Sequence, residues 1–136
     1  MEDKKTFYIT TTIPYVNAAP HIGFALEIVQ ADTLARFKRL MGYGVFFNFG
    51  SDEHGQKILQ MANQNNITPQ AYVDEYAQKF SALKETLNLS YDAFIRTTDQ
   101  KHKAAAQEMW RLCEAAGDIE KKEYEIKYCV GCELEK

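Results

Sequence analysis

The sequence has few cysteines, no long apolar run and no excess of positive charge. Three cysteines in 136 residues, only two of them close together, do not make the disulfide framework of a small secreted domain. A net charge of −3 excludes the strongly basic surface with which a domain binds nucleic acid through its phosphates. No apolar stretch approaches the roughly 20 residues that cross a bilayer, and the start, MEDKKTFYITTT, lacks the hydrophobic segment of a secretory signal. We therefore expect a cytoplasmic protein that makes no membrane contact.

The composition that remains, 46% apolar and 26% charged, is that of a soluble globular domain. Residues 6–12 (TFYITTT) are β-branched and aromatic and predict a buried strand, followed by a loop that ends at Pro20. Apolar residues recur with helical spacing between residues 21 and 41, at Ile22, Leu26, Val29, Phe37 and Leu40. Residues 45–49 (VFFNF) then have the length of a strand. Strand, helix and strand predict a βαβ unit with a parallel sheet.

The rest of the chain is predicted to be mainly helical. Residues 56–65 form one helix, and residues 68–87 form another that begins with Thr68 as N-cap and Pro69 at its first position. Residues 90–98 are partly extended, and residues 99–116 form a last helix in which Cys113 is a buried small hydrophobe. Alternation in residues 120–129 predicts a strand that leads into the CVGC segment. The fold class is therefore α/β.

The junction of the first strand and the first helix is one candidate site. Ligands of open parallel sheets bind beyond the carboxyl ends of the strands, where a helix N-terminus offers N–H groups to phosphate. Gly23 would allow close approach of a nucleotide, and His21 could donate a hydrogen bond to a phosphate oxygen as charge develops. The alternative is that His21 is only a polar residue near a helix start and Gly23 a packing glycine.

The segment GSDEHG, residues 50–55, is the second candidate because it ends the neighbouring strand. Asp52 could offer its carboxylate to a ligand's ammonium while the helix start holds phosphates, an arrangement that suits an amino acid and ATP. The alternative is a solvated turn or the cap of the next helix. A metal triad is disfavoured because three consecutive residues cannot easily converge on one ion.

Cys129 and Cys132 have the two-residue gap of a zinc knuckle. Four ligands are usual, and no second pair follows in the sequence. A redox CxxC would start a helix, and ELEK follows instead. Half a zinc knuckle and a pair of surface cysteines both remain open from the residues alone.

Four segments carry a family resemblance: PYVNAAPHIG, GSDEHG, YDAFIRTT and EYEIKYCVGCE. In order and spacing they resemble the amino-terminal half of the catalytic domain of bacterial methionyl-tRNA synthetases, which are class I aminoacyl-tRNA synthetases. The isoleucine, valine and leucine enzymes share the HIGH-type signature, but DEHG and the placement of CxxC resemble the methionine enzymes. The resemblance covers nearly the whole chain. It implies a Rossmann-like nucleotide-binding parallel sheet over residues 1–117 and the start of a zinc-knuckle insertion over residues 118–136.

The resemblance also implies an activity, methionine-tRNA ligase, which forms methionyl-adenylate from L-methionine and ATP with Mg²⁺ and transfers the methionyl group to its tRNA. Residues that match family positions for methionine binding are Ile13, Tyr15 and Asp52. Residues that match the ATP-binding signature are Pro20, His21, Gly23 and Phe24, of which His21 and Gly23 are the catalytic positions. The metal ligands are Cys129 and Cys132, with Zn²⁺ expected only in a longer chain. The methionine tRNA would be bound through regions outside this chain.

Three departures from the family pattern leave the activity of the isolated chain open. Phe24 stands where the signature has its second histidine, so a phosphate contact is lost. The KMSKS-type lysine loop is not in the sequence, and residues 79–84 (KFSALK) imitate it in letters only, because they lie mid-helix. No anticodon-binding helical domain is present. One rival is a small adenylyltransferase of the related nucleotide-binding fold, which would not explain DEHG or CVGC. Another is a non-catalytic zinc-binding or interaction module derived from a synthetase.

Overall fold

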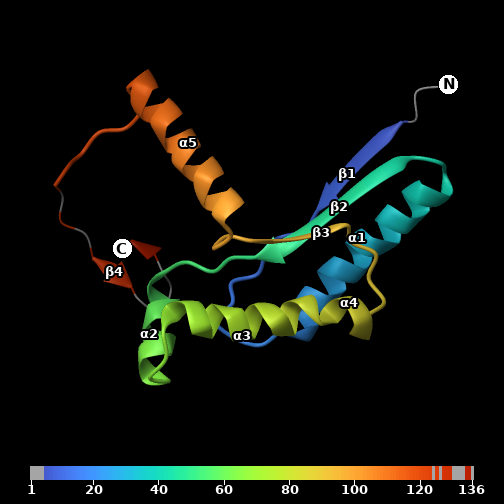
Figure 1. Cartoon of the computed structure of the whole chain (residues 1–136), viewed down its shortest axis with the longest axis horizontal. Coiled ribbons are helices and arrows are strands. Elements are labelled where there is room, and N and C mark those ends of the chain that lie inside the picture. Colours follow the sequence, from blue (N-terminus) through green and yellow to red (C-terminus); the bar gives the residue numbers. More distant parts are fainter. Residues whose placement is uncertain (1–4, 124, 126, 130–133, 136) are drawn as a thin grey trace. The chain divides into compact units, whose positions relative to one another are not determined.

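The computed structural model describes residues 5–123, 125, 127–129 and 134–135, and the chain divides into two compact units, Met1–Asp99 and Gln100–Lys136 (Figure 1). The first unit contains three strands, β1 (Thr6–Thr10), β2 (Gly44–Ser51) and β3 (Ala93–Arg96). Its helices are α1 (Ile22–Leu40), α2 (Gln56–Gln64), α3 (Pro69–Ser81) and α4 (Leu83–Thr86). The second unit contains α5 (Gln100–Ala116) and the two-residue strands β4 (Tyr128–Cys129) and β5 (Leu134–Glu135).

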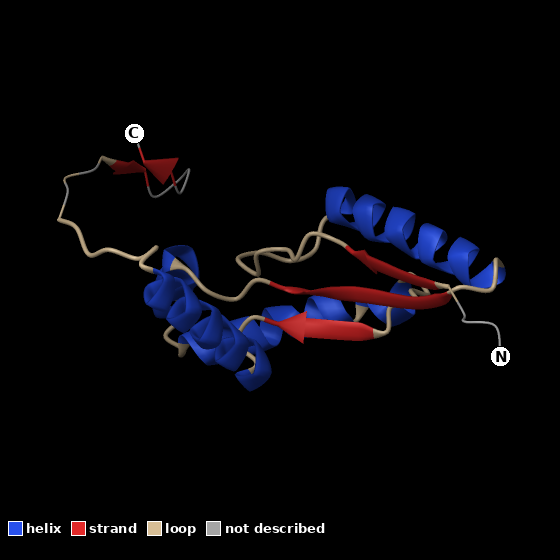
Figure 2. Cartoon of the chain, turned by 90° about the horizontal axis from the view of Figure 1, so that it is seen from above, coloured by secondary structure: helices blue, strands red, loops and turns tan. Residues whose placement is uncertain are grey.

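The sheet of the first unit is parallel, with β2 in the centre (order β1-β2-β3), and Figure 2 shows its strands side by side. Thr6 is paired with Gly44 at one end of the β1–β2 ladder, and Ser51 is paired with Arg96 at the carboxyl end of the β2–β3 ladder. Gly50 allows the second pairing, because a Cβ at this position would lie 2.1 Å from the carbonyl oxygen of Ile95. The predicted α/β fold with a parallel sheet is confirmed.

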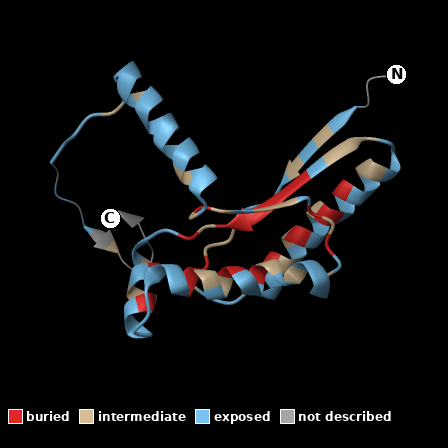
Figure 3. Ribbon diagram, viewed as in Figure 1, coloured by how far each residue is buried: buried red, intermediate tan, exposed pale blue. Residues whose placement is uncertain are grey.

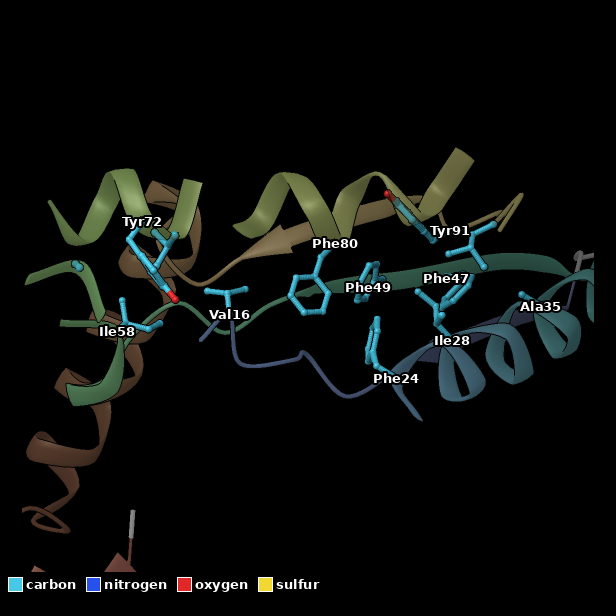
Figure 4. Packing of buried hydrophobic residues seen from close by; sticks show 13 residues of the cluster. Val16, Phe24, Ile28, Ala35, Phe47, Phe49, Ile58, Tyr72, Phe80 and Tyr91 are labelled. Carbon is cyan, nitrogen blue, oxygen red and sulfur yellow. The ribbon is translucent and has the colours of Figure 1, made fainter. Parts of the chain in front are cut away.

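The hydrophobic core lies on the sheet face that carries Phe47 and Phe49, both fully buried (Figures 3 and 4). Phe24 of α1 stacks on Phe49 with ring centroids 5.4 Å apart and meets Phe80 of α3 edge-on at 5.5 Å. Helices α1 and α3 therefore pack together on this one face. The opposite face carries Phe46, 48% exposed and stacked on Tyr8.

The predicted elements are found, with changes at their ends. Helix α1 begins after its N-cap His21, α2 ends before Asn65, and α3 starts at Pro69 with Thr68 as N-cap. The expected single helix over residues 68–87 is instead α3 and α4, separated at Ala82. The central strand is longer than predicted and runs to Ser51.

Two predictions for the second unit need correction. Cys113 was expected to be buried but is only half-buried, and no residue of α5 is buried in this unit. The expected strand over residues 120–129 is limited to Tyr128–Cys129 among the described residues. The boundary predicted between residues 117 and 118 divides the nucleotide-binding part from the zinc-knuckle insertion, and it stays a prediction. None of the described helices is long and apolar enough to span a membrane.

The predicted apolar stripe of α1 does not face the core. Ile22 is 89% exposed and Leu40 is 86% exposed, and Leu26, Val29 and Phe37 are exposed as well. The buried residues of the helix are Phe24, Ile28, Asp32 and Ala35. They follow the same helical spacing on another side of the helix, so periodicity identified the helix and gave the wrong face.

Candidate functional site

The start of α1 is organised by His21. Its backbone is extended, its Nδ1 accepts a hydrogen bond from Gly23 N at 3.1 Å, and its carbonyl oxygen accepts from the N–H groups of Phe24 and Ala25. The N–H groups of these three residues are thus satisfied at the helix start itself. An imidazole that accepts through Nδ1 carries its proton on Nε2 when it is neutral. The exposed ring of His21 can therefore donate to a ligand through Nε2.

Gly23 leaves room for the His21 ring. A Cβ on residue 23 would lie 3.1 Å from Cε1 and 3.2 Å from Nδ1 of the His21 ring. With an alanine at this position the imidazole would have to shift by a few tenths of an ångström. The contact agrees with a packing role for Gly23, and its role toward a nucleotide stays a prediction.

A surface cavity of about 430 Å³ opens beside this helix start. Its wall comes from the loop after β1, the first two turns of α1 and one side chain of α3: Thr12, Pro14, Tyr15, Asn17, Ala18, Ala19, His21, Gly23, Phe24, Glu27 and Phe80. Four residues expected at the site, Tyr15, His21, Gly23 and Phe24, are thus brought together. Ile13, Pro20 and Asp52 are not among the described residues that line the cavity.

Asp52 is joined to the cavity wall through the backbone. Its N–H donates to the carbonyl of Pro14 at 2.9 Å, and its carbonyl accepts from Val16 N at 3.1 Å. These bonds pair Asp52 with Tyr15 as an isolated parallel bridge, one residue beyond the end of β2. Parallel pairing therefore extends one residue past the end of β2. It holds the Asp52 backbone beside Tyr15, which lines the cavity.

Phe24 has two environments. It is only 7% exposed and belongs to the core through Phe49 and Phe80, yet it also forms part of the cavity wall. The position at which the signature has a second histidine is thus an apolar support between sheet and helix. Residues 79–84 are likewise structural: Phe80 is buried, and Lys84 Nζ donates to the carbonyl of Tyr91 at 2.9 Å.

Sequence analysis missed Glu27 and the pairing of Glu53 with Arg96. Glu27 accepts a hydrogen bond from Thr12 N at 2.7 Å and so ties the loop to α1. It lies four residues after Gly23 and three after Phe24, so helical spacing from the signature would have placed it on the same side. The Glu53 side chain is fully buried and forms an ion pair with Arg96 of β3 at 2.7 Å. No sequence pattern links these two residues.

The charged network reaches α3 through Asp74. Arg96 Nη2 donates to Asp74 Oδ1 at 2.6 Å, and this hydrogen bond holds the pKa of the Asp74 carboxyl below its usual value of 3.8. Strand β2 therefore ends in a segment connected to β3 and α3 by side-chain hydrogen bonds.

Only one of the two predicted metal ligands lies within the described residues, so the predicted pair stays a prediction. Cys129 ends β4 and is half-buried, whereas Cys132 lies outside the described residues. Within the described part of the chain, no three His, Cys, Asp or Glu side chains form a group that could hold a metal ion. A closed zinc site needs four ligands, of which the sequence predicts two.

Comparisons with known proteins identify the family of the chain. The model of the family described as tRNA synthetases class I (M) matches residues 7–134. Methionine–tRNA ligase of Thermotoga maritima is 51% identical over 127 residues, which are 93% of this chain and 20% of that protein. The chloroplastic/mitochondrial methionine–tRNA ligase of Arabidopsis thaliana is 44% identical over 98% of this chain and 22% of its own length.

Solved structures give the same result. Mycobacterium tuberculosis methionyl-tRNA synthetase in complex with methionyl-adenylate matches with a TM-score of 0.92 and 45% identity, over 97% of this chain and 26% of that one. A leucyl-tRNA synthetase from Agrobacterium radiobacter, 21% identical with a TM-score of 0.84, shares the fold. The chain spans about a fifth of the length of the curated relatives that it matches. On its family match and its identity to these relatives, the chain belongs to the class I tRNA synthetases of the methionine type.

Proposed function

We propose that the chain supplies the part of a methionine-tRNA ligase that binds L-methionine and ATP and holds them for adenylate formation. The observation that carries this proposal is the bridge between Asp52 and Tyr15, because it joins an acidic residue at the carboxyl end of β2 to the wall of the cavity at the start of α1. A carboxylate and the exposed His21 ring in that relation suit a ligand with an ammonium group at one end and phosphates at the other.

The methionine end of the site comprises Asp52, Tyr15 and Ile13. Asp52 would accept hydrogen bonds from the substrate ammonium, and a carboxylate is the group that pairs best with this cation. Tyr15 lines the cavity and offers an aromatic surface, and Ile13, 36% exposed, adds an apolar contact at the same loop. The loop that carries them is held by Glu27 through Thr12 and by Tyr72, whose hydroxyl donates to the carbonyl of Asn17 at 3.1 Å.

The ATP end comprises Pro20, His21, Gly23 and Phe24. A methionine carboxylate oxygen would attack the α-phosphorus of ATP, the bond to the bridging oxygen would break, and pyrophosphate would leave with that electron pair. His21 would donate from Nε2 to a phosphate oxygen as negative charge develops. Gly23 keeps the ring in that position, and Phe24 forms the apolar floor beneath it. ATP would be bound as its Mg²⁺ complex, which neutralises part of the triphosphate charge.

The remaining assignments follow from membership of the family. Transfer of the methionyl group to a tRNA and a cytoplasmic location belong to the complete ligase. The zinc-knuckle insertion would begin in residues 118–136, with Cys129 and Cys132 supplying two of its four ligands.

Calorimetric titration of the chain with L-methionine tests the proposal. A hydrogen bond to a charged group contributes on the order of 1.5–3 kcal/mol, so Asp52→Asn should weaken binding about tenfold or more. Asp118→Asn removes an exposed carboxylate after α5 and is the matched control, which should bind like the unaltered chain. Unchanged affinity in the Asp52 variant, or no methionine binding by the unaltered chain, contradicts the proposal.

A further inference from the structure

The Glu53 carboxylate is fully buried and receives four hydrogen bonds. Oε1 accepts from Ser51 Oγ at 2.6 Å and from Arg96 Nε at 2.7 Å. Oε2 accepts from Arg96 Nη2 at 2.9 Å and from the hydroxyl of Thr98. The bidentate ion pair fixes the guanidinium plane as well as its distance, which a single contact would not do. Removal of Arg96 would leave a buried charge without its counter-ion, a strongly unfavourable state.

The same segment is held by its backbone. The N–H of Glu53 donates to Thr97 Oγ1 at 2.8 Å, and the carbonyl of Ser51 accepts from Thr97 N at 3.2 Å. Asp52 lies between these two anchored residues and is bonded on its other side to Pro14 and Val16. The backbone dihedral angles of Asp52 therefore depend on contacts made by both of its neighbours.

We propose that Arg96 is a positioning residue for amino-acid binding: it holds Glu53 and thereby fixes the backbone from which Asp52 presents its carboxylate to the substrate ammonium. This inference rests on the proposed function. Arg96 is not among the described residues that line the cavity. It would therefore affect binding through residues 51–54 and not by contact with the ligand. A misplacement of about 1 Å caused by a remote mutation can cost about 10²-fold in rate, and we expect a comparable shift of this backbone to weaken binding as well.

The chain offers a matched arginine for comparison. Arg39 of α1 also links elements through side-chain hydrogen bonds, from Nη1 to Ser90 Oγ at 2.7 Å and from Nη2 to Asp92 Oδ2 at 2.8 Å. Both residues that Arg39 contacts precede β3 in the sequence, and neither belongs to residues 51–54. Loss of Arg39 therefore removes similar interactions without touching Asp52 or its neighbours.

The test measures L-methionine and ATP binding by calorimetry, and unfolding by urea, for the unaltered chain and for Arg96→Gln, Arg96→Lys and Arg39→Gln. We expect Arg96→Gln to weaken methionine binding about tenfold or more, with ATP binding changed much less. Arg96→Lys keeps a cation beside Glu53 and should recover part of the methionine affinity. Arg39→Gln should lower the free energy of unfolding and leave methionine affinity unchanged.

The inference is overturned if Arg96→Gln binds methionine normally, or if methionine and ATP affinities fall together in both arginine variants. If Arg96→Gln does not fold, Thr98→Val decides the question, because it removes one donor to Glu53 and keeps the ion pair. A normal methionine affinity in that variant then contradicts the inference. Absence of methionine binding by the unaltered chain contradicts the proposed function, and this inference with it, whereas binding that is insensitive to these variants contradicts the inference alone.

Discussion

The hydroxyl of Tyr15 occupies the space in which a side chain at Gly55 would begin. A Cβ built on Gly55 would lie 2.4 Å from this oxygen and 3.2 Å from Cζ of the same ring. Gly55 also has φ = +124°, which side-chain-bearing residues rarely adopt. Two features therefore favour glycine at position 55, the end of the DEHG segment: the positive φ of its backbone and the ring of Tyr15.

Gly55→Ala should consequently lower stability and displace Tyr15. Backbone strain of this kind costs on the order of 1–3 kcal/mol, and the clash with the phenol adds to it. Gly42→Ala is the control, because Gly42 also has a positive φ, +86°, but a Cβ there would meet nothing within 4 Å. Urea denaturation should show the larger loss for Gly55→Ala, and methionine binding should weaken in that variant only. Equal losses in both variants would remove the Tyr15 contact from the explanation.

Phe24→His should destabilise the chain, although it restores the histidine of the family signature. The new imidazole would lie between the rings of Phe49 and Phe80, and neither ring can accept or donate a conventional hydrogen bond. We expect a loss on the order of 2–4 kcal/mol in the free energy of unfolding. Phe37→His changes a residue of the same helix that is 53% exposed and should cost far less. A stable Phe24→His variant would mean that the ring turns into the cavity and finds a partner there.

Alkaline pH should weaken the fold through Tyr72. This residue is 2% exposed, and burial, followed by the adjacent Tyr76, raises its pKa from 10.0 to about 12. The unfolded chain loses the proton first, so the free energy of unfolding should fall between pH 10 and pH 12 and level off above that range. Tyr72→Phe should show a smaller fall and lose about 0.5–1.5 kcal/mol at neutral pH, because its hydrogen bond to Asn17 is gone. Tyr8→Phe is the control, because Tyr8 is 61% exposed. In urea denaturation at several pH values, its free energy of unfolding should fall with pH as much as that of the unaltered chain.

Zinc should bind the chain in well under one equivalent. Cys129 and Cys132 provide two thiolates, and a closed structural site needs four ligands, so the ion would be held weakly or shared between two molecules. Metal analysis after dialysis against a chelator checks this prediction, with Cys129→Ser as the variant that should lose the residual metal. A full equivalent that resists the chelator would show that other residues complete the site.

The elements could be predicted from the sequence because their signals are local. Pro69 after Thr68 marks the start of α3, and β-branched and aromatic residues mark β1. The buried face of α1 could not be predicted, because two apolar stripes run along this helix: Ile22 and Leu26 follow the same spacing as Phe24 and Ile28. Only the position of the sheet decides which stripe is buried.

The sequence proposes residues for the candidate site, and it says little about their contacts. Motif positions identified His21, Gly23 and Asp52, but not that His21 caps its own helix through Nδ1. That bond depends on a side-chain rotamer, which no spacing rule specifies. The Glu53–Arg96 pair was missed for a different reason: its partners are 43 positions apart and meet only when β3 joins the sheet.

This separation has a consequence for the order in which the chain folds. Strands β1 and β2 and helix α1 form a continuous segment that can assemble early, whereas β3 arrives after α2, α3 and α4. Until Arg96 arrives, the Glu53 side chain has to stay hydrated or take up a proton, because burying the carboxylate alone is strongly unfavourable. The carboxyl end of β2 therefore cannot close before β3 docks. We therefore expect the carboxyl end of β2 to become fully buried only when β3 joins the sheet, so that the segment around Asp52 is ordered late in folding.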